Sequence, residues 1–503
     1  MTERKGTEAD APFYHPDHPR PRTRREFLGQ GFMTGAAYVV APSILSMLGV
    51  NRANAQASCA LTGAGAGKVP FIGIDLAGGA NIAGSNVMIG GPGGQDDPLA
   101  EDGYERLGLP LDMTPLNSAI TAVDRTLNLA FHFDSAMLAG ILDKADPATL
   151  AKVEGVIVPS RSSNDTQNNP LNPIYGIYSA GADGGLLSLI GTRASDSGGS
   201  SMVPATMFLP EVRPTKIDRP SDVRGLVDTG KLTSLLGATG AGNVAQAVQA
   251  ISSLKVEQIQ EDAAVKDLVN CAYQQSSDLI TLFGDPNALD PELDTRIVSA
   301  NPADDPIFTA AEMNMSEFRK TSSVMKLVLE GHAGAGTIQF GGYDYHDSTR
   351  TTGEAKDFRV GQAIGAILEY AERNPLVGDL MIYLFSDGSV FSDGQTDNGA
   401  NGKGVWRGDN SSTAAAVLLV YRKSSKPDLV PAYATTRQIG HFRSGGTVET
   451  GANSVANNPE ALAQMVILNY MALHGEEGNF STLFPGSAIQ TDMASLIGFT
   501  QIR

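Results

Sequence analysis

The sequence predicts an α/β protein with a mainly parallel sheet that is covered by helices on both faces. Short apolar segments that read as buried strands alternate with longer segments whose apolar residues recur at helical spacing. Polar residues directly follow several of the strands, as they do where parallel strands end at a ligand site. The repeated order of strand, polar turn and helix is typical of a three-layer arrangement.

The first half of the chain is predicted to hold two buried strands, continuous in apolar residues, and two helices with leucines on one face. The strands are 68–76 and 155–159, and the helices are 114–130 and 135–144. Residues around 181–310 read as an insertion that is first loop-rich and then helical, with its clearest helical region over 243–283. A Pro/Asp-rich connector forms the C-terminal end of this insertion.

The second half repeats the pattern more clearly. We expect helices over 315–329, 354–373 and 458–474, and strands at 338–340, 380–385 and 414–421. A long loop, 389–412, contains Trp406, which is expected to pin it to the body of the protein.

Composition narrows the classes of partner. The chain has 503 residues and a net charge of −18. A negative surface repels nucleic acid and anionic membranes, so neither is expected as a partner.

The N-terminus predicts export by the twin-arginine translocase. Residues 23–28 read TRREFL, an uncharged and moderately apolar run follows over 29–50, and Ala53-Asn54-Ala55 gives a small-x-small cleavage pattern. Residues 1–55 are therefore assigned to a signal peptide, and 56–503 to a single periplasmic or secreted domain without a transmembrane segment. Retention of the apolar run as a membrane anchor is the alternative, because it is about long enough to span a bilayer.

The chain has two cysteines, Cys59 and Cys271. In an oxidising compartment these two cysteines are able to form a disulfide bond. Because Cys271 lies in an apolar helical pattern, we favour a buried thiol there and a separate N-terminal thiol at Cys59.

A candidate metal site lies in the stretch Thr337–Ser348, which reads TIQFGGYDYHDS. Asp344 and His346 are two residues apart, so in an extended segment both side chains point the same way. A carboxylate and an imidazole that converge on one spot suit a divalent metal such as zinc.

Other predicted strand ends carry polar groups as well. They are Asp75 with Asn81, the cluster Ser162–Asp165, and Asp387, while Asp409 lies just before the last strand. Because the carboxyl ends of parallel strands meet at one edge, we expect these groups to gather around Asp344 and His346.

At these residues the chain resembles the bacterial family called domain of unknown function 1501. The leader, the block Leu76–Asn81, the cluster Ser162–Asp165, the block Gly341–His346 and Ser386-Asp387-Gly388 carry the resemblance. Members of this family are similar in fold to the alkaline phosphatase and sulfatase superfamily and are commonly exported by the twin-arginine route. The resemblance implies an alkaline-phosphatase-like fold with metal ligands Asp344, His346, Asp387 and Asp409, and with Asp75 as a substitute ligand.

Departures from the family pattern are expected to weaken the binding of the second metal ion in a two-metal site. The family has a histidine at the position of Asn410, an aspartate at the position of Asn81 and a histidine at the position of Ser163. Zinc, magnesium, manganese and calcium all stay open as the divalent metal, since oxygen-rich ligation favours the last three.

Two functions follow. In the first, the chain is a metal-dependent hydrolase of anionic phosphate or sulfate esters, with Ser85 or Ser162 as nucleophile and Arg161 and Asn81 binding the substrate. In the second, the site is degenerate, and the chain binds a ligand or scaffolds an assembly in the periplasm.

Overall fold

The computed structural model describes residues 66–162, 170–192, 207–210, 212–227, 231–258, 263–283, 285–343, 348 and 350–503. The predicted signal peptide, Cys59, Asp344 and His346 lie outside these described residues.

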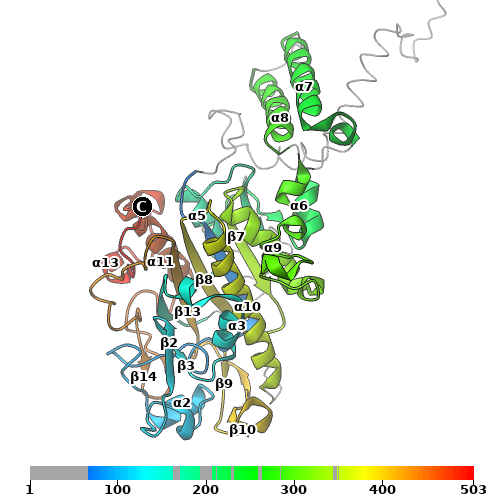
Figure 1. Ribbon diagram of the computed structural model, residues 1–503. Helices are drawn as coiled ribbons and strands as arrows, with labels where there is room; N and C mark the ends of the chain where they lie inside the picture. Colours follow the sequence, from blue (N-terminus) through cyan, green and yellow to red (C-terminus); the bar gives the residue numbers. More distant parts are fainter. Residues whose placement is uncertain are drawn as a thin grey trace, which may run out of the picture.

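A seven-stranded sheet forms the centre of the molecule (Figure 1), with the strand order β4-β13-β8-β1-β7-β5-β6. In chain order the strands are β1 (Phe71–Gly79), β4 (Val153–Pro159), β5 (Leu187–Gly191), β6 (Thr215–Lys216), β7 (Ala333–Phe340), β8 (Asp379–Gly388) and β13 (Ala415–Arg422). β13 runs antiparallel to both of its neighbours, and every other pair in the sheet is parallel. The predicted mainly parallel sheet is therefore confirmed, with one reversed strand that apolar periodicity does not distinguish.

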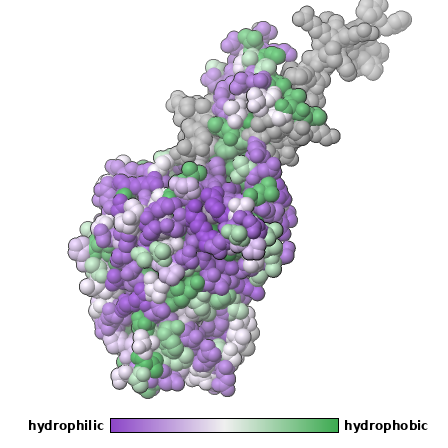
Figure 2. All heavy atoms as spheres, viewed as in Figure 1, coloured by the Kyte–Doolittle hydropathy of each residue, from purple (hydrophilic) through white to green (hydrophobic). Residues whose placement is uncertain are grey.

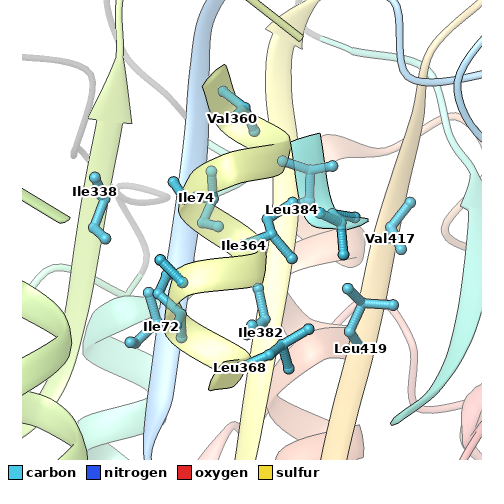
Figure 3. Packing of buried hydrophobic residues seen from close by; sticks show 14 of the residues in the cluster. Ile72, Ile74, Ile338, Val360, Ile364, Leu368, Ile382, Leu384, Val417 and Leu419 are labelled. Carbon is cyan, nitrogen blue, oxygen red and sulfur yellow. The ribbon is translucent and has the colours of Figure 1, made fainter. Parts of the chain in front are cut away.

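Helices cover both faces of this sheet, which confirms the predicted three-layer α/β fold. One face packs under α3 (Ala136–Lys144), α9 (Ser316–Leu329) and α10 (Thr351–Arg373), and the other under α5 (Ile174–Ser179) and α11 (Pro459–Ala472). Figure 3 shows Val360, Ile364 and Leu368 of α10 over the strand residues Ile72, Ile74, Ile338, Ile382, Leu384, Val417 and Leu419. Each such buried side chain contributes roughly 1.5–3 kcal/mol to folding.

α10 and α3 cross closely because both carry glycine at the contact. A Cβ on Gly361 would lie 2.0 Å from the carbonyl oxygen of Met137, and a Cβ on Gly140 would lie 2.0 Å from that of Phe358. Backbone therefore packs against backbone, and the middle of α10 is held against α3.

The remaining elements are short. They are α2 (Glu101–Arg106), β2 (Val123–Leu127), β3 (Leu129–His132), α4 (Pro147–Leu150), α6 (Pro220–Leu226), β9 (Val390–Phe391), β10 (Thr396–Asp397), β11 (Lys403–Gly404), β12 (Gly408–Asp409), β14 (Phe442–Arg443), β15 (Thr447–Val448), α12 (Phe480–Leu483) and α13 (Met493–Leu496). None of the helices in the described ranges has the length and apolarity needed to cross a bilayer.

The predicted helix over 114–130 is wrong. β2 and β3 form an antiparallel pair there, and Asn128 between them has a φ of 63°. β3 is buried along its whole length, so its apolar residues have no two-residue alternation that would have marked it as a strand. A left-handed residue ends a helix and suits a tight turn, and Asn tolerates that conformation better than most residues.

The predicted helical insertion consists of α7 (Lys231–Val256) and α8 (Ala263–Phe283), which pack along each other and project from the body (Figure 1). α7 is kinked at Gly237, whose φ is 68°. Cys271 on α8 is disulfide-bonded, so the predicted free thiol at this position is wrong. Apolar helical periodicity identified the helix at Cys271 but gave no information on the pairing of its sulfur.

Replacing Gly361 with alanine is expected to lower the free energy of unfolding by about 1–3 kcal/mol, because the new methyl group overlaps the Met137 carbonyl. Gly225→Ala on α6 is the control: nothing lies within 4 Å of its added Cβ, and the exchange removes glycine from a helix. Urea unfolding of both variants measures the difference. Equal stability of the two variants would show that α3 and α10 do not pack this closely.

Candidate functional site

The carboxyl ends of the central strands β1 and β8 are joined by side chains of β8. The backbone N–H of Gly78 donates to Oδ1 of Asp387 at 2.8 Å. The hydroxyl oxygen of Ser386 lies 2.8 and 2.6 Å from the carbonyl oxygens of Leu76 and Gly78, which compete for its single proton, and it accepts from the N–H of Ala80. Asp387 is 5% exposed, so its carboxylate is held in a nearly buried position at the edge of the sheet.

The chain that leaves β7 is attached to the same place. The N–H of Tyr343 donates to the carbonyl oxygen of Ala77 at 3.1 Å, and Tyr343 is buried. Ala77 directly precedes Gly78, which binds Asp387. Asp344 and His346, the predicted ligands that follow Tyr343 in the sequence, lie outside the described residues.

Hydroxyl groups continue this edge from β8 towards β13 and β4. The hydroxyls of Ser389 and Thr413 lie 2.8 Å apart, and the N–H of Asn410 donates to the carbonyl of Ser389. The N–H of Ser162, after β4, donates to the carbonyl of Ser411 at 3.2 Å. The carboxyl ends of β8 and β4 and the amino end of the antiparallel β13 therefore form one polar edge.

Asp409 lies at this edge but is exposed. It is on β12, opposite Val390 of β9, which follows Asp387 by three residues. Asp409 is exposed and Asp387 is nearly buried, and the prediction that both bind one metal ion stays a prediction.

Asp75 lies deeper in the protein. On β1 its Cα is opposite those of Gln339 on β7 and Phe385 on β8, and its side chain is fully buried. Burial, and then the charge of Asp75, raise the pKa of Tyr383 well above its usual value. Asp75 thus acts electrostatically on the interior of the face covered by α5 and α11, below the edge where Asp387 lies.

The described part of the predicted metal set does not make a metal site by itself. Within the described ranges, no three histidine, cysteine, aspartate or glutamate side chains are close enough together to hold a metal ion. Asp387, Asp409 and Asp75 therefore need further ligands, and the metal site stays a prediction.

Arg161 and Ser162 form a positively charged corner of the edge. The Arg161 side chain donates to Ser411 Oγ at 2.8 Å and to Asn457 Oδ1 at 3.2 Å. Its buried Nε and the buried hydroxyl of Ser162 have no hydrogen-bond partner in the described structure. No carboxylate of the described ranges pairs with this guanidinium, so an anion would find unused donors here.

Asn81 and Ser85 form a pair whose hydrogen-bond partners differ from those of Ser162, the other candidate nucleophile. The amide of Asn81 donates to the hydroxyl of Ser85, and both side chains are buried. The amide of Asn86 donates to the Asn81 carbonyl at 2.7 Å and to Asp357 Oδ2 of α10 at 2.8 Å. Neither Ser85 nor Ser162 contacts a basic side chain among the described hydrogen bonds that would accept its proton.

Asp357 supports the turn that carries Asn81 and Ser85. The carboxyl is 2% exposed, and burial, followed by the negative charge of Glu354, raises its pKa well above the usual value. A protonated Asp357 accepts from Asn86 without a buried charge.

The loop 389–412 is held by a buried ionic network that sequence reasoning missed. The guanidinium of Arg350 stacks over Trp406 at 4.4 Å and pairs with Glu354 at 2.7 Å, and Lys403 pairs with the other oxygen of Glu354 at 2.9 Å. Trp406 is buried, so it pins the loop as predicted. Only the four-residue spacing of Arg350 and Glu354 signals this network in the sequence.

The described geometry defines a three-layer α/β protein with a polar edge at the carboxyl ends of its strands. A scan against protein-family models finds no match to this chain, and a search of curated proteins finds none either.

Replacing Asp357 with asparagine is expected to stabilise the protein at pH 7–8 and to have little effect near pH 4. The pKa of Asp357 is higher in the folded than in the unfolded chain, so the wild-type protein loses stability as the pH rises above the unfolded value. Asparagine keeps the acceptor for Asn86 and does not ionise. Urea midpoints measured from pH 4 to 8 test this, and parallel curves for the two proteins would contradict it.

Proposed function

We propose that the chain is a twin-arginine-exported periplasmic protein that binds a divalent metal and an anionic small molecule at the carboxyl edge of its sheet. The observation that carries the proposal is that two consecutive residues of β1, Ala77 and Gly78, bind Tyr343 and Asp387. The segment that contains Asp344 and His346 therefore starts at the strand end that holds Asp387. The likeness to the domain of unknown function 1501 family supports the same ligands.

In this proposal Asp387, Asp344 and His346 are the principal metal ligands, and Asp409 and Asp75 are secondary candidates. A mixed set of carboxylate and imidazole ligands suits zinc or manganese, while a set dominated by carboxylates suits magnesium or calcium. When bound, such a metal supplies charge that attracts and polarises an anionic group. Gly78 orients the Asp387 carboxylate by holding one of its oxygens.

Arg161 and Ser162 support the anionic ligand. The positive charge of Arg161 is not neutralised by a carboxylate of the described ranges, and its Nε–H and the Ser162 hydroxyl are unused donors. In a chain with a net charge of −18, such a corner favours an anion over a cation.

Hydrolysis of phosphate or sulfate esters is the second candidate function, because the proposed superfamily fold hosts that chemistry. The contacts of Ser85 and Ser162 favour binding over catalysis, since within the described ranges neither hydroxyl faces a group that would take its proton.

Metal content tests the proposed site. Elemental analysis of the purified exported protein is expected to find a divalent metal, and Asp387→Asn and His346→Ala are each expected to lower metal affinity at least about tenfold. Asp379→Asn is the control, because this carboxylate lies at the opposite end of the same strand and pairs with Arg503. A wild-type protein that carries no metal, or variants that retain it, would overturn the proposed site.

Hydrolysis is tested with chromogenic phosphate and sulfate esters. If the chain is a hydrolase, metal-loaded protein cleaves at least one ester, and Asp344→Ala and His346→Ala abolish cleavage. The variant Ser162→Ala then separates the two candidate nucleophiles from each other. Metal-loaded protein without turnover on any ester would assign the chain to the binding role.

A further inference from the structure

The segment that leads into β1 is clamped to the C-terminal end of α11. The N–H of Val69 donates to Nε2 of His474 at 3.0 Å, and the carbonyl oxygen of Val69 accepts from the hydroxyl of Tyr470 at 2.8 Å. The ammonium group of Lys68 pairs with the carboxylate of Glu476. Both backbone groups of Val69 and the side chain before it are therefore bound at one helix end.

Residues from the far end of the sequence complete this clamp. The guanidinium of Arg503 donates to the carbonyl oxygen of Gly67 and pairs with Asp379 at 3.0 Å. The N–H groups of Ile502 and Arg503 both donate to the carbonyl oxygen of Leu473 at 3.0 Å, so this segment lies beside the end of α11 (Figure 1). Three parts of the chain that are distant in sequence therefore meet here.

The position of His474 is fixed by the way in which α11 ends. The N–H of Gly475 donates to the carbonyl oxygen of Ala472, and the N–H of Glu476 donates to that of Met471, both at 3.0 Å. Gly475 has a φ of 67°, the left-handed conformation that glycine adopts without strain. These contacts form a Schellman motif, in which His474 is the last residue before the chain turns away from the helix.

The two ring nitrogens of His474 have opposite roles in the clamp. Nδ1 lies 2.8 Å from the carbonyl oxygen of Tyr470, which only accepts, so Nδ1 carries the proton. Nε2 accepts from the N–H of Val69, so it carries none. A second proton on the ring would place a donor at Nε2 against the donor of Val69. The clamp therefore requires the neutral imidazole.

Burial and two neighbouring cations oppose that second proton. Burial is the largest cause that lowers the pKa of His474 below its usual value, and the charges of Lys68 and Arg503 lower it further. The carbonyl of Tyr470 and the charge of Glu476 raise the pKa, but they are outweighed. The unfolded chain takes up this proton more readily than the folded chain, so the histidine's contribution to stability is complete above about pH 6.5 and is lost as the pH falls below that value.

Water has access to the clamp. His474 is half-buried, and the side chains of Lys68 and Glu476 are 21% and 38% exposed. The surface of the body that carries the clamp is mostly hydrophilic in the view of Figure 2. A change of pH in the solvent therefore reaches the imidazole directly.

We propose that His474 is a pH-sensitive latch, which holds the entry of β1 against α11 when neutral and releases Val69 when protonated. The added positive charge also competes with Lys68 for Glu476. β1 itself stays in the sheet, because it is paired on both sides from Phe71 onwards. The latch contains none of the metal or anion ligands proposed above, so its test is independent of that proposal.

Hydrogen exchange of the purified protein, followed by mass spectrometry, measures the protection of the Val69 N–H. After correction for the intrinsic effect of pH on exchange, this protection is expected to be at least about tenfold lower at pH 5 than at pH 7.5 in the wild-type protein. In His474→Gln it is expected to be equal at both pH values, because the glutamine oxygen accepts from Val69 and does not ionise. His441→Gln is the matched control: His441 lies outside the clamp, beside β14, and this variant is expected to keep the wild-type pH dependence.

A second variant and a second amide separate the latch from general effects of acid. Lys68→Gln is expected to raise the pH at which the Val69 N–H loses protection, because the charge of Lys68 lowers the pKa of His474. The amide of Ile382, in the buried middle of β8, reports on the whole fold and is expected to stay protected at both pH values. Three results would overturn the latch: wild-type protection of Val69 that does not change with pH, a fall in protection that His474→Gln retains, or a simultaneous loss of protection at Ile382.

Discussion

The attachment of β8 to β1 at their carboxyl ends is the constraint on which the site depends. The Ser386 hydroxyl accepts from the N–H of Ala80 and donates its proton to a carbonyl at the end of β1, and Asp387 accepts from Gly78. β1 and β8 are central strands of the sheet. Because their carboxyl ends are held together, the neighbouring segments that bind to these ends are held in place as well. Tyr343 follows on one side through Ala77, and Ser389 with Thr413 on the other. Backbone partners satisfy these polar groups, so a nearly buried carboxylate is tolerated at this edge.

Much of the fold was predictable because the apolar pattern is strong where burial is complete. β7 and β8 are buried along their whole length, and α9 and α10 are buried on all sides over residues 321–329 and 360–371. The pattern failed at 114–130, because short strands and a helix give similar apolar spacings. The left-handed conformation of Asn128 makes a turn there, which a helix does not allow. The reversed direction of β13 was also out of reach, since direction depends on the path of the connection and not on the strand itself.

The candidate site was predictable only in part. The rule that ligand groups follow parallel strands placed Asp387, Asp409 and Ser162 at one edge. The rule did not choose between Ser85 and Ser162 as nucleophile, and the structure gives them different surroundings, since Ser85 accepts from Asn81 while Ser162 binds Ser411 through its backbone. The network of Arg350, Glu354 and Lys403 joins residues about fifty positions apart, and nothing in local sequence reports that contact. Tertiary hydrogen bonds of this kind decide the role of a polar residue, while composition and spacing only propose it.

The hairpin and the polar edge are physically separable parts of one chain. α7 and α8 lie between β6, at the margin of the sheet, and α9, so no strand that carries the edge is interrupted by them. The strands β8, β1 and β7 are buried mainly under α3, α9 and α10 on one face and under α5 and α11 on the other. Exposed leucines on the hairpin therefore cost the body no packing, and changes in the hairpin leave Ser386 and Asp387 in place. In this arrangement the residues of the hairpin can be substituted while the residues at the carboxyl edge of the sheet keep their contacts.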